Sequence, residues 1–180
     1  MEKQLEESNS SIRISKLFNK ALSINNCSYS ETWIIAFDLE PNDHHHLNEC
    51  FALLKKEIDF FFAQLQSNNI NLRENVLSVL KSSYNVIDFG LYNQPWNSHK
   101  QKLLPNQLLI LFDTYSTLIP IDEGIISTAE IKQLISYISN LKDLLSKSLL
   151  SISVKEFVND LIHKMENAII SYKINGSIVL

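Results

Sequence analysis

Residues 153–172 read SVKEFVNDLIHKMENAIISY, and the spacing of the apolar side chains in this stretch decides the fold. Apolar residues recur three or four positions apart, and in a β-strand this spacing would scatter them over both faces. They are Val154, Phe157, Val158, Leu161, Ile162, Met165, Ala168, Ile169 and Tyr172. On an α-helix they form one stripe that has to be buried, so the stretch predicts a packed helical domain.

Two helix-start signals mark the last third of the chain, residues 125–172. Ser127 is followed by Glu130, and Ser153 is followed by Glu156. In such a capping box the serine oxygen accepts from a free backbone N–H, and the glutamate three residues later accepts from the N–H of the serine. The sequence therefore predicts two helices that begin at these serines.

The composition favours long helices joined by short links. The chain has 180 residues, of which 45% are hydrophobic, with only 3 Gly and 4 Pro. Sandwiches and barrels need many tight turns with positive φ, which glycine supplies most easily. We therefore predict an all-α fold, a single helical bundle of about six or seven helices over residues 1–180. An irregular connection is expected at about residues 84–104, where Gly, Pro and Asn interrupt the helical pattern.

The charge and the cysteines argue against several classes of protein. The net charge is -4 and the few basic residues are dispersed, so we expect no binding to nucleic acid. Cys27 and Cys50 lie far apart in the sequence, which argues against a disulfide scaffold. The chain shows neither the apolar core of a signal peptide nor an uninterrupted membrane-spanning run. These features favour a cytoplasmic protein without membrane contact.

The expected core consists of large apolar side chains at helical spacing. Burial of each stabilises the fold by about 1.5–3 kcal/mol, so Leu161→Asp is expected to unfold the protein. The expected core residues are Leu54, Ile58, Phe61, Leu109, Phe112, Ile135, Ile138, Phe157, Leu161, Ile162 and Ile169.

No motif of an enzyme, a cofactor site or a metal site is found. The chain lacks Gly-x-Ser-x-Gly, a glycine-rich phosphate loop and His-Glu-x-x-His. The adjacent histidines 44–46 point about 100° apart on a helix, so they cannot all bind one metal ion. The pairs His45 with Glu49 and His46 with Cys50 lack further zinc ligands nearby. We therefore predict no catalytic residue, no cofactor and no metal.

An enzyme whose site assembles from distant residues stays open as the alternative. A metal-dependent hydrolase or nuclease would be its form, with His46, Glu49, His99 and Asp113 as the first polar groups to inspect. A pocket that gathers two of these groups within hydrogen-bonding distance would favour the enzyme.

Four aromatic residues are the predicted partner-binding residues. Tyr92 and Trp96 lie in the irregular connection, where long loops often carry function and aromatic side chains dominate binding. The alternative is that these loop aromatics complete the core. Phe60 and Phe62 lie beside the seven-residue seam of the helix around residues 47–65, and they predict a homo-oligomer or a protein partner that contacts residues 50–65.

Two segments together resemble uncharacterised small helical proteins of bacteria, some of which belong to mobile or defence-related gene sets. The first is Pro95-Trp96 with the following Leu103-Leu104-Pro105, and the second runs from Met165 to Gly176. The resemblance covers about the C-terminal half, implies an all-α fold and a bacterial source, and brings no active site. We therefore expect a non-enzymatic protein–protein interaction or regulatory protein, with a component of a bacterial toxin–antitoxin or anti-phage defence system as the specific form.

Overall fold

The computed structural model describes residues 7–121, 123–124 and 128–175. Within them the chain is mostly helical, which confirms the all-α prediction. The α-helices are α1 (Ser10–Ser23), α2 (Tyr29–Ala36), α3 (His44–Ser67), α4 (Glu74–Lys81), α5 (Lys100–Leu103), α6 (Asn106–Ser116), α7 (Thr128–Lys147) and α8 (Ile152–Asn175). Two short strands, β1 (Glu7–Ser8) and β2 (Glu123–Gly124), pair antiparallel.

The expected irregular connection contains short 3-10 turns. These are η1 (Ser82–Val86), η2 (Phe89–Leu91) and η3 (Trp96–Ser98), followed by α5. The connection is fastened to α2, because the backbone N–H groups of Tyr29 and Ser30 donate to the carbonyls of Gln94 and Tyr92 at 2.8 and 3.1 Å. The segment from Ser82 to Leu103, which we call the strap, therefore lies against the helices.

Side-chain caps fix where several helices begin. Asp43 accepts from the backbone N–H of His46 at 3.2 Å and starts α3. Ser28 and Glu31 form the capping box that starts α2. The box predicted at Ser153 is wrong, because α8 already begins at Ile152 and Ser153 lies within its first turn. Ser127 of the other predicted box lies outside the described residues.

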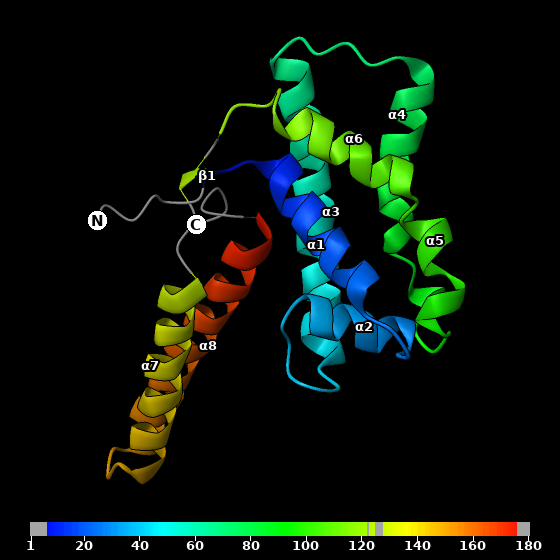
Figure 1. The fold of residues 1–180 in the computed structure, drawn as a ribbon. Helices are drawn as coiled ribbons and strands as arrows, with labels where there is room; N and C mark the ends of the chain where they lie inside the picture. The colour runs from blue at the N-terminus through cyan, green and yellow to red at the C-terminus, as the bar shows by residue number, and fades with distance from the viewer. Residues whose placement is uncertain (1–6, 122, 125–127, 176–180) are drawn as a thin grey trace.

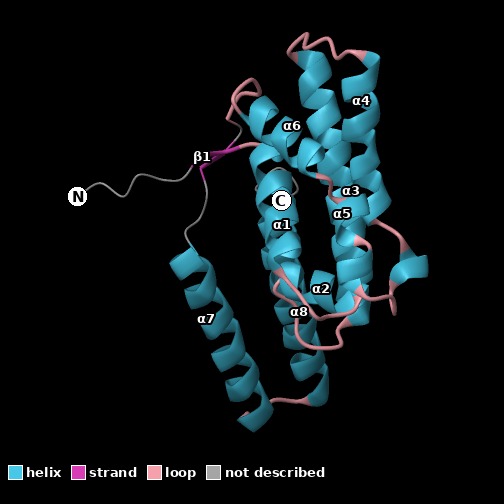
Figure 2. Ribbon diagram, turned by 45° about the vertical axis from the view of Figure 1, so that its right-hand side comes forward, coloured by secondary structure: helices cyan, strands magenta, loops and turns pink. Residues whose placement is uncertain are grey.

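The helices are arranged as a body, α1–α6, and a hairpin, α7–α8 (Figure 1). Helix α1 packs against α6 and α3, and α8 packs along α3 and also contacts α1. Helix α7 packs on α8, so that α8 lies between α7 and the body (Figures 1 and 2). Among the described residues, the hairpin thus has a neighbour on one side only.

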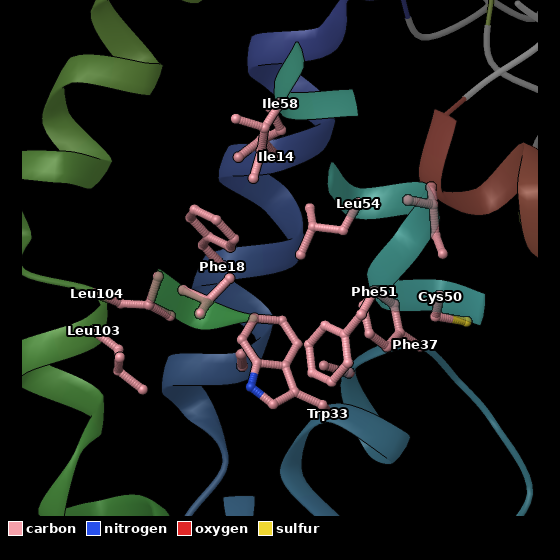
Figure 3. Packing of buried hydrophobic residues seen from close by; sticks show 14 of the residues in the cluster. Ile14, Phe18, Trp33, Phe37, Cys50, Phe51, Leu54, Ile58, Leu103 and Leu104 are labelled. Carbon is pink, nitrogen blue, oxygen red and sulfur yellow. The ribbon is translucent and has the colours of Figure 1, made fainter. Parts of the chain in front are cut away.

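The body encloses the main hydrophobic core, which is rich in aromatic rings. Trp33 lies 5.6 Å from Phe37 and 5.5 Å from Phe51, centroid to centroid, and Phe37 meets Phe51 edge to face at 5.7 Å (Figure 3). Ile14 of α1 and Ile58 of α3 meet higher in the same core (Figure 3). Such edge-to-face pairs add about 0.5–1.5 kcal/mol each beyond the burial of their area.

Polar side chains also join the helices of the body. Ser11 Oγ of α1 donates to the carbonyl of Phe112 in α6 at 2.6 Å. Arg13 Nε of α1 donates to Glu57 Oε1 of α3 at 2.7 Å, and both side chains are less than a tenth exposed. Buried charges and hydroxyls need such partners, so these bonds fix the relative positions of α1, α3 and α6.

A second, smaller hydrophobic cluster lies inside the hairpin. Ile138 and Leu145 of α7 and Ile162 of α8 are buried there, with Val158 and Ile169 packed against them. Each helix of the hairpin therefore buries only a narrow ridge of its apolar stripe against the other.

The predicted core is right for the body and partly wrong for the hairpin. Leu54, Ile58, Phe61, Phe112, Ile138 and Ile162 are buried, and Leu109 and Ile169 are half-buried. Ile135, Phe157 and Leu161 are exposed, at 43%, 64% and 42% of their surface, so their predicted burial is wrong. The physical reason is that α7 and α8 cover only one ridge of each other, and the body covers α8 on a different side, so the rest of each apolar stripe stays exposed.

The expected effect of Leu161→Asp changes accordingly. Because Leu161 is exposed while Ile162 is 1% exposed, Leu161→Asp is expected to keep the helical content of the wild type. Ile162→Asp places a carboxylate inside the hairpin and is expected to cost about 4 kcal/mol, enough to melt the hairpin. Far-ultraviolet circular dichroism of the two variants in dilute solution checks this. Equal helix loss in both would contradict the burial difference.

Candidate protein-interaction surface

Eight apolar side chains of the hairpin are partly exposed to solvent, and we call them the hairpin face. Their exposed fractions lie between 39% and 66%. They are Leu134, Tyr137, Leu141 and Leu144 of α7, and Val154, Phe157, Leu161 and Met165 of α8. Contiguous apolar surface of this extent is rare on monomeric proteins and marks interaction sites.

Helix geometry places both halves of this face on the same side of the hairpin. Leu134 and Leu141 lie four residues before and three after the buried Ile138, which is one flank of the buried ridge. Met165 and Leu161 lie three after and one before the buried Ile162, which is the corresponding flank of α8. When two helices run antiparallel, residues that are rotated in the same sense from the residues facing the partner helix lie on the same side of the pair.

An ion pair on the opposite flank supports this arrangement. Lys142 and Glu166 lie four residues after Ile138 and Ile162, and Lys142 Nζ donates to Glu166 Oε1 at 2.7 Å. Ile170, four residues beyond Glu166 on the same flank, packs on the main core of the body. The body therefore meets the Lys142–Glu166 flank of α8, and the hairpin face points away from the body.

The hairpin face carries no charged side chain. All eight of its positions are apolar, and polar groups lie at its edge: Gln133 donates from Nε2 to the Tyr137 hydroxyl at 2.6 Å, and the exposed Glu130 lies four residues before Leu134. Further apolar side chains are exposed at the same end of the hairpin: Leu149 and Leu150 in the link are 104% and 49% exposed, and Ile152 at the start of α8 is 77% exposed. An apolar centre with a polar rim is the composition of a protein interface.

Trp96, predicted to bind a partner, belongs to the core. Its ring is 0% exposed, and its Nε1–H donates to the Ala21 carbonyl at 3.1 Å. The ring also meets Tyr29 and Trp33 edge to face at 5.9 and 6.0 Å. With no exposed surface, the Trp96 side chain is not available for contact, and the alternative reading of the loop aromatics applies to it.

Tyr92 is half-buried and also held by the body. Its hydroxyl donates to Asn48 Oδ1 of α3, and its ring stacks on those of Tyr29 and His44. Burial raises the pKa of the Tyr92 phenol, so that it stays protonated and remains a donor at neutral pH. Tyr92 therefore fastens the strap to α3, and a contact of its exposed part with a partner stays a prediction.

Phe60 and Phe62 are both half-buried. The Phe62 ring stacks on Tyr84 at 6.1 Å and packs against the main core. Burial and the hydrogen bond to Asp59 raise the pKa of the Tyr84 phenol, whose hydroxyl donates to Asp59 Oδ1 at 2.6 Å. Part of the Phe62 surface is thus covered within the chain, and partner contact at residues 50–65 stays a prediction.

Other partners hold three of the four polar residues of the enzyme alternative, namely His46, Glu49 and Asp113. His46 Nδ1 lies 2.5 Å from Asp43 Oδ2, and Glu49 Oε1 lies 3.6 Å from the Nε2 of His45. In the part of the chain that the structure describes, no bond joins any two of the four, and no cluster of three His, Cys, Asp or Glu side chains suits a metal ion.

Asp113 lines an open hollow of about 390 Å³ together with side chains of α1. Its Oδ1 accepts from Ser15 Oγ at 2.5 Å across the contact between α1 and α6. His46, Glu49 and His99 are not among the residues that line this hollow. The criterion for a gathered site is therefore not met at Asp113.

Comparison with known proteins leaves the surface as the main guide to function. The chain matches no protein-family model, no curated protein and no solved structure. Among the described helices, none combines the length and the hydrophobicity that a bilayer-spanning helix requires.

Sequence reasoning missed the hairpin face because it assigned the whole stripe of residues 153–172 to the core. The available signal was the position of two amphipathic helices next to each other at the end of the chain, joined by four residues from Ser148 to Ser151. Such a link is short enough to force an antiparallel pair.

Proposed function

We propose that the protein is a non-enzymatic interaction protein that binds a protein surface through the hairpin face. The single observation that carries this proposal is the set of eight apolar side chains, 39–66% exposed, on the side of the hairpin that points away from the body. Exposed apolar surface is costly in water, and selection retains it where another surface covers it.

The size of the face is suited to specific binding. Covering the exposed half of eight large side chains yields about 6–12 kcal/mol at about 1.5–3 kcal/mol for each complete burial. Association costs about 4–15 kcal/mol in lost freedom of motion. Net binding therefore needs a partner that covers most of the face, which favours one well-fitting protein over loose contacts.

The finer parts of the proposal rest on the sequence. Regulation of a partner, a cytoplasmic location and membership of a bacterial toxin–antitoxin or anti-phage system come from the composition and from the resemblance of residues 95–105 and 165–176. None of them changes the contact surface that we propose.

Photo-crosslinking in the source cells tests the proposal. A benzophenone amino acid replaces Phe157, which is 64% exposed on the hairpin face, or Asn159, which is exposed on the opposite flank of the same helix. Ultraviolet light is expected to join the chain to one discrete protein through position 157 and not through position 159. Crosslinks of equal yield from both positions, or none from position 157, would contradict the proposal.

A further inference from the structure

We propose that the protein covering the hairpin face is a second copy of this chain. Two hairpins would pack face to face about a two-fold axis and form a four-helix bundle, with the two bodies on the outside. This inference rests on the proposed function and names the partner. It draws on the area, the charge and the helical repeat of the hairpin.

The area of the face is close to that of a stable dimer interface. Eight side chains that are about half exposed present about 700 Å² if each large apolar side chain offers about 150–200 Å². Each partner of a standard stable complex buries about 800 Å². Leu149, in the link between the two helices, is 104% exposed and adds apolar area at the end of the hairpin. The face is therefore large enough for a dimer without any other contact.

The charge distribution suits self-association in particular. A symmetric interface brings the same patch of both copies together, so any charge at its centre meets an identical charge. The protein has a net charge of -4, and its surface charges would repel a second copy. The hairpin face has no charged side chain at any of its eight positions, and the Lys142–Glu166 pair lies on the other flank. Two copies therefore meet there through apolar side chains, with the exposed Glu130 at the end of the face and no charge at its centre.

The apolar residues of α7 form two seven-residue rows, as on a helix of a four-helix bundle, but only one of the rows is covered within the chain. Ile131, Ile138 and Leu145 repeat every seven residues and face α8, and the last two are buried. Leu134 and Leu141 form the second seven-residue row and are 41% and 39% exposed. In a four-helix bundle both rows are covered, because each helix has two neighbours. A second hairpin supplies the missing layer.

Sedimentation velocity of the full-length chain over a range of concentrations tests the inference. The wild type is expected to sediment as a dimer of twice the 20.7 kDa chain mass. Phe157→Lys and Leu144→Lys each place two charges in the symmetric interface, and each is expected to raise the dissociation constant at least about 100-fold. Both side chains are more than 60% exposed in one chain, so the helical content should stay unchanged.

The matched control is Asn159→Lys, which adds the same side chain to the polar flank of α8 and should remain a dimer. A wild type that is monomeric at every concentration would overturn the inference. If position 157 then still crosslinks to a different protein, the proposed function stands with another partner, and if it does not, both fail. The inference would also be overturned if Phe157→Lys and Leu144→Lys both remain dimers while Phe60→Lys is monomeric, because the contact would then lie on α3.

Discussion

Arg13→Met is expected to lower the free energy of unfolding by about 3–5 kcal/mol, because it removes one partner of a buried ion pair. The Arg13 and Glu57 side chains are 7% and 3% exposed, and Nε lies 2.7 Å from Oε1. The Glu57 carboxylate is buried and has lost its hydration, and the positive charge of Arg13 compensates for this loss. Without the guanidinium this compensation is removed. Since domains are stable by about 5–15 kcal/mol, this loss is a large share of the total.

A double variant separates the charge effect from simple loss of packing. Arg13→Met with Glu57→Leu replaces both charges by apolar groups, which is often neutral or stabilising, so most of the lost stability should return. Urea unfolding of both variants at one fixed protein concentration measures this, because association would otherwise change the apparent stability. A double variant as unstable as Arg13→Met alone would show that the ion pair is not the cause.

The helices of the body could be predicted because each apolar stripe there has neighbours on several sides. On α3 the seven-residue seam through Leu47, Leu54 and Phe61 predicts burial, and all three side chains are 0% exposed. The Asp43 side chain caps the start of this helix, with chemistry that is typical of a helix start. Local spacing and capping chemistry therefore carry enough information for this part of the fold.

The hairpin could not be predicted to the same degree, because a stripe shows which side of a helix is apolar and not how many surfaces cover it. Phe157 and Ile162 belong to one stripe of α8, yet they are 64% and 1% exposed. The difference arises from tertiary contacts, since α7 covers only the ridge through Ile162. The candidate surface is thus the part of the apolar stripe that stays exposed to solvent in the single chain.

The turns show a second limit of prediction from the amino-acid composition. Only 3 glycines are present, which predicts few positions with positive φ. In the described residues Asn26, Asp38, Asn42 and Asn69 adopt φ between 55° and 66°. Asparagine and aspartate tolerate this conformation better than other side chains do, so they provide the left-handed turns between the helices.

Trp96→Ala is expected to cost about 3–5 kcal/mol, because it empties the space of a ring that is 0% exposed and deletes its hydrogen bond to Ala21. Phe89→Ala is the matched control, since Phe89 lies in the same strap but is 57% exposed, and it should cost about 1 kcal/mol or less.

Thermal unfolding followed by circular dichroism compares the Trp96 and Phe89 variants, again at one protein concentration. If the strap is structural, Trp96→Ala melts at a much lower temperature, and the part that stays folded still dimerises through the hairpin face. The opposite pattern, wild-type stability with loss of association, would make Trp96 a partner-binding residue and would mean that its ring leaves the core. The burial of the indole argues against that pattern, because on leaving the core the ring would lose its contacts with Tyr29 and Trp33 together with the bond from Nε1–H to the Ala21 carbonyl.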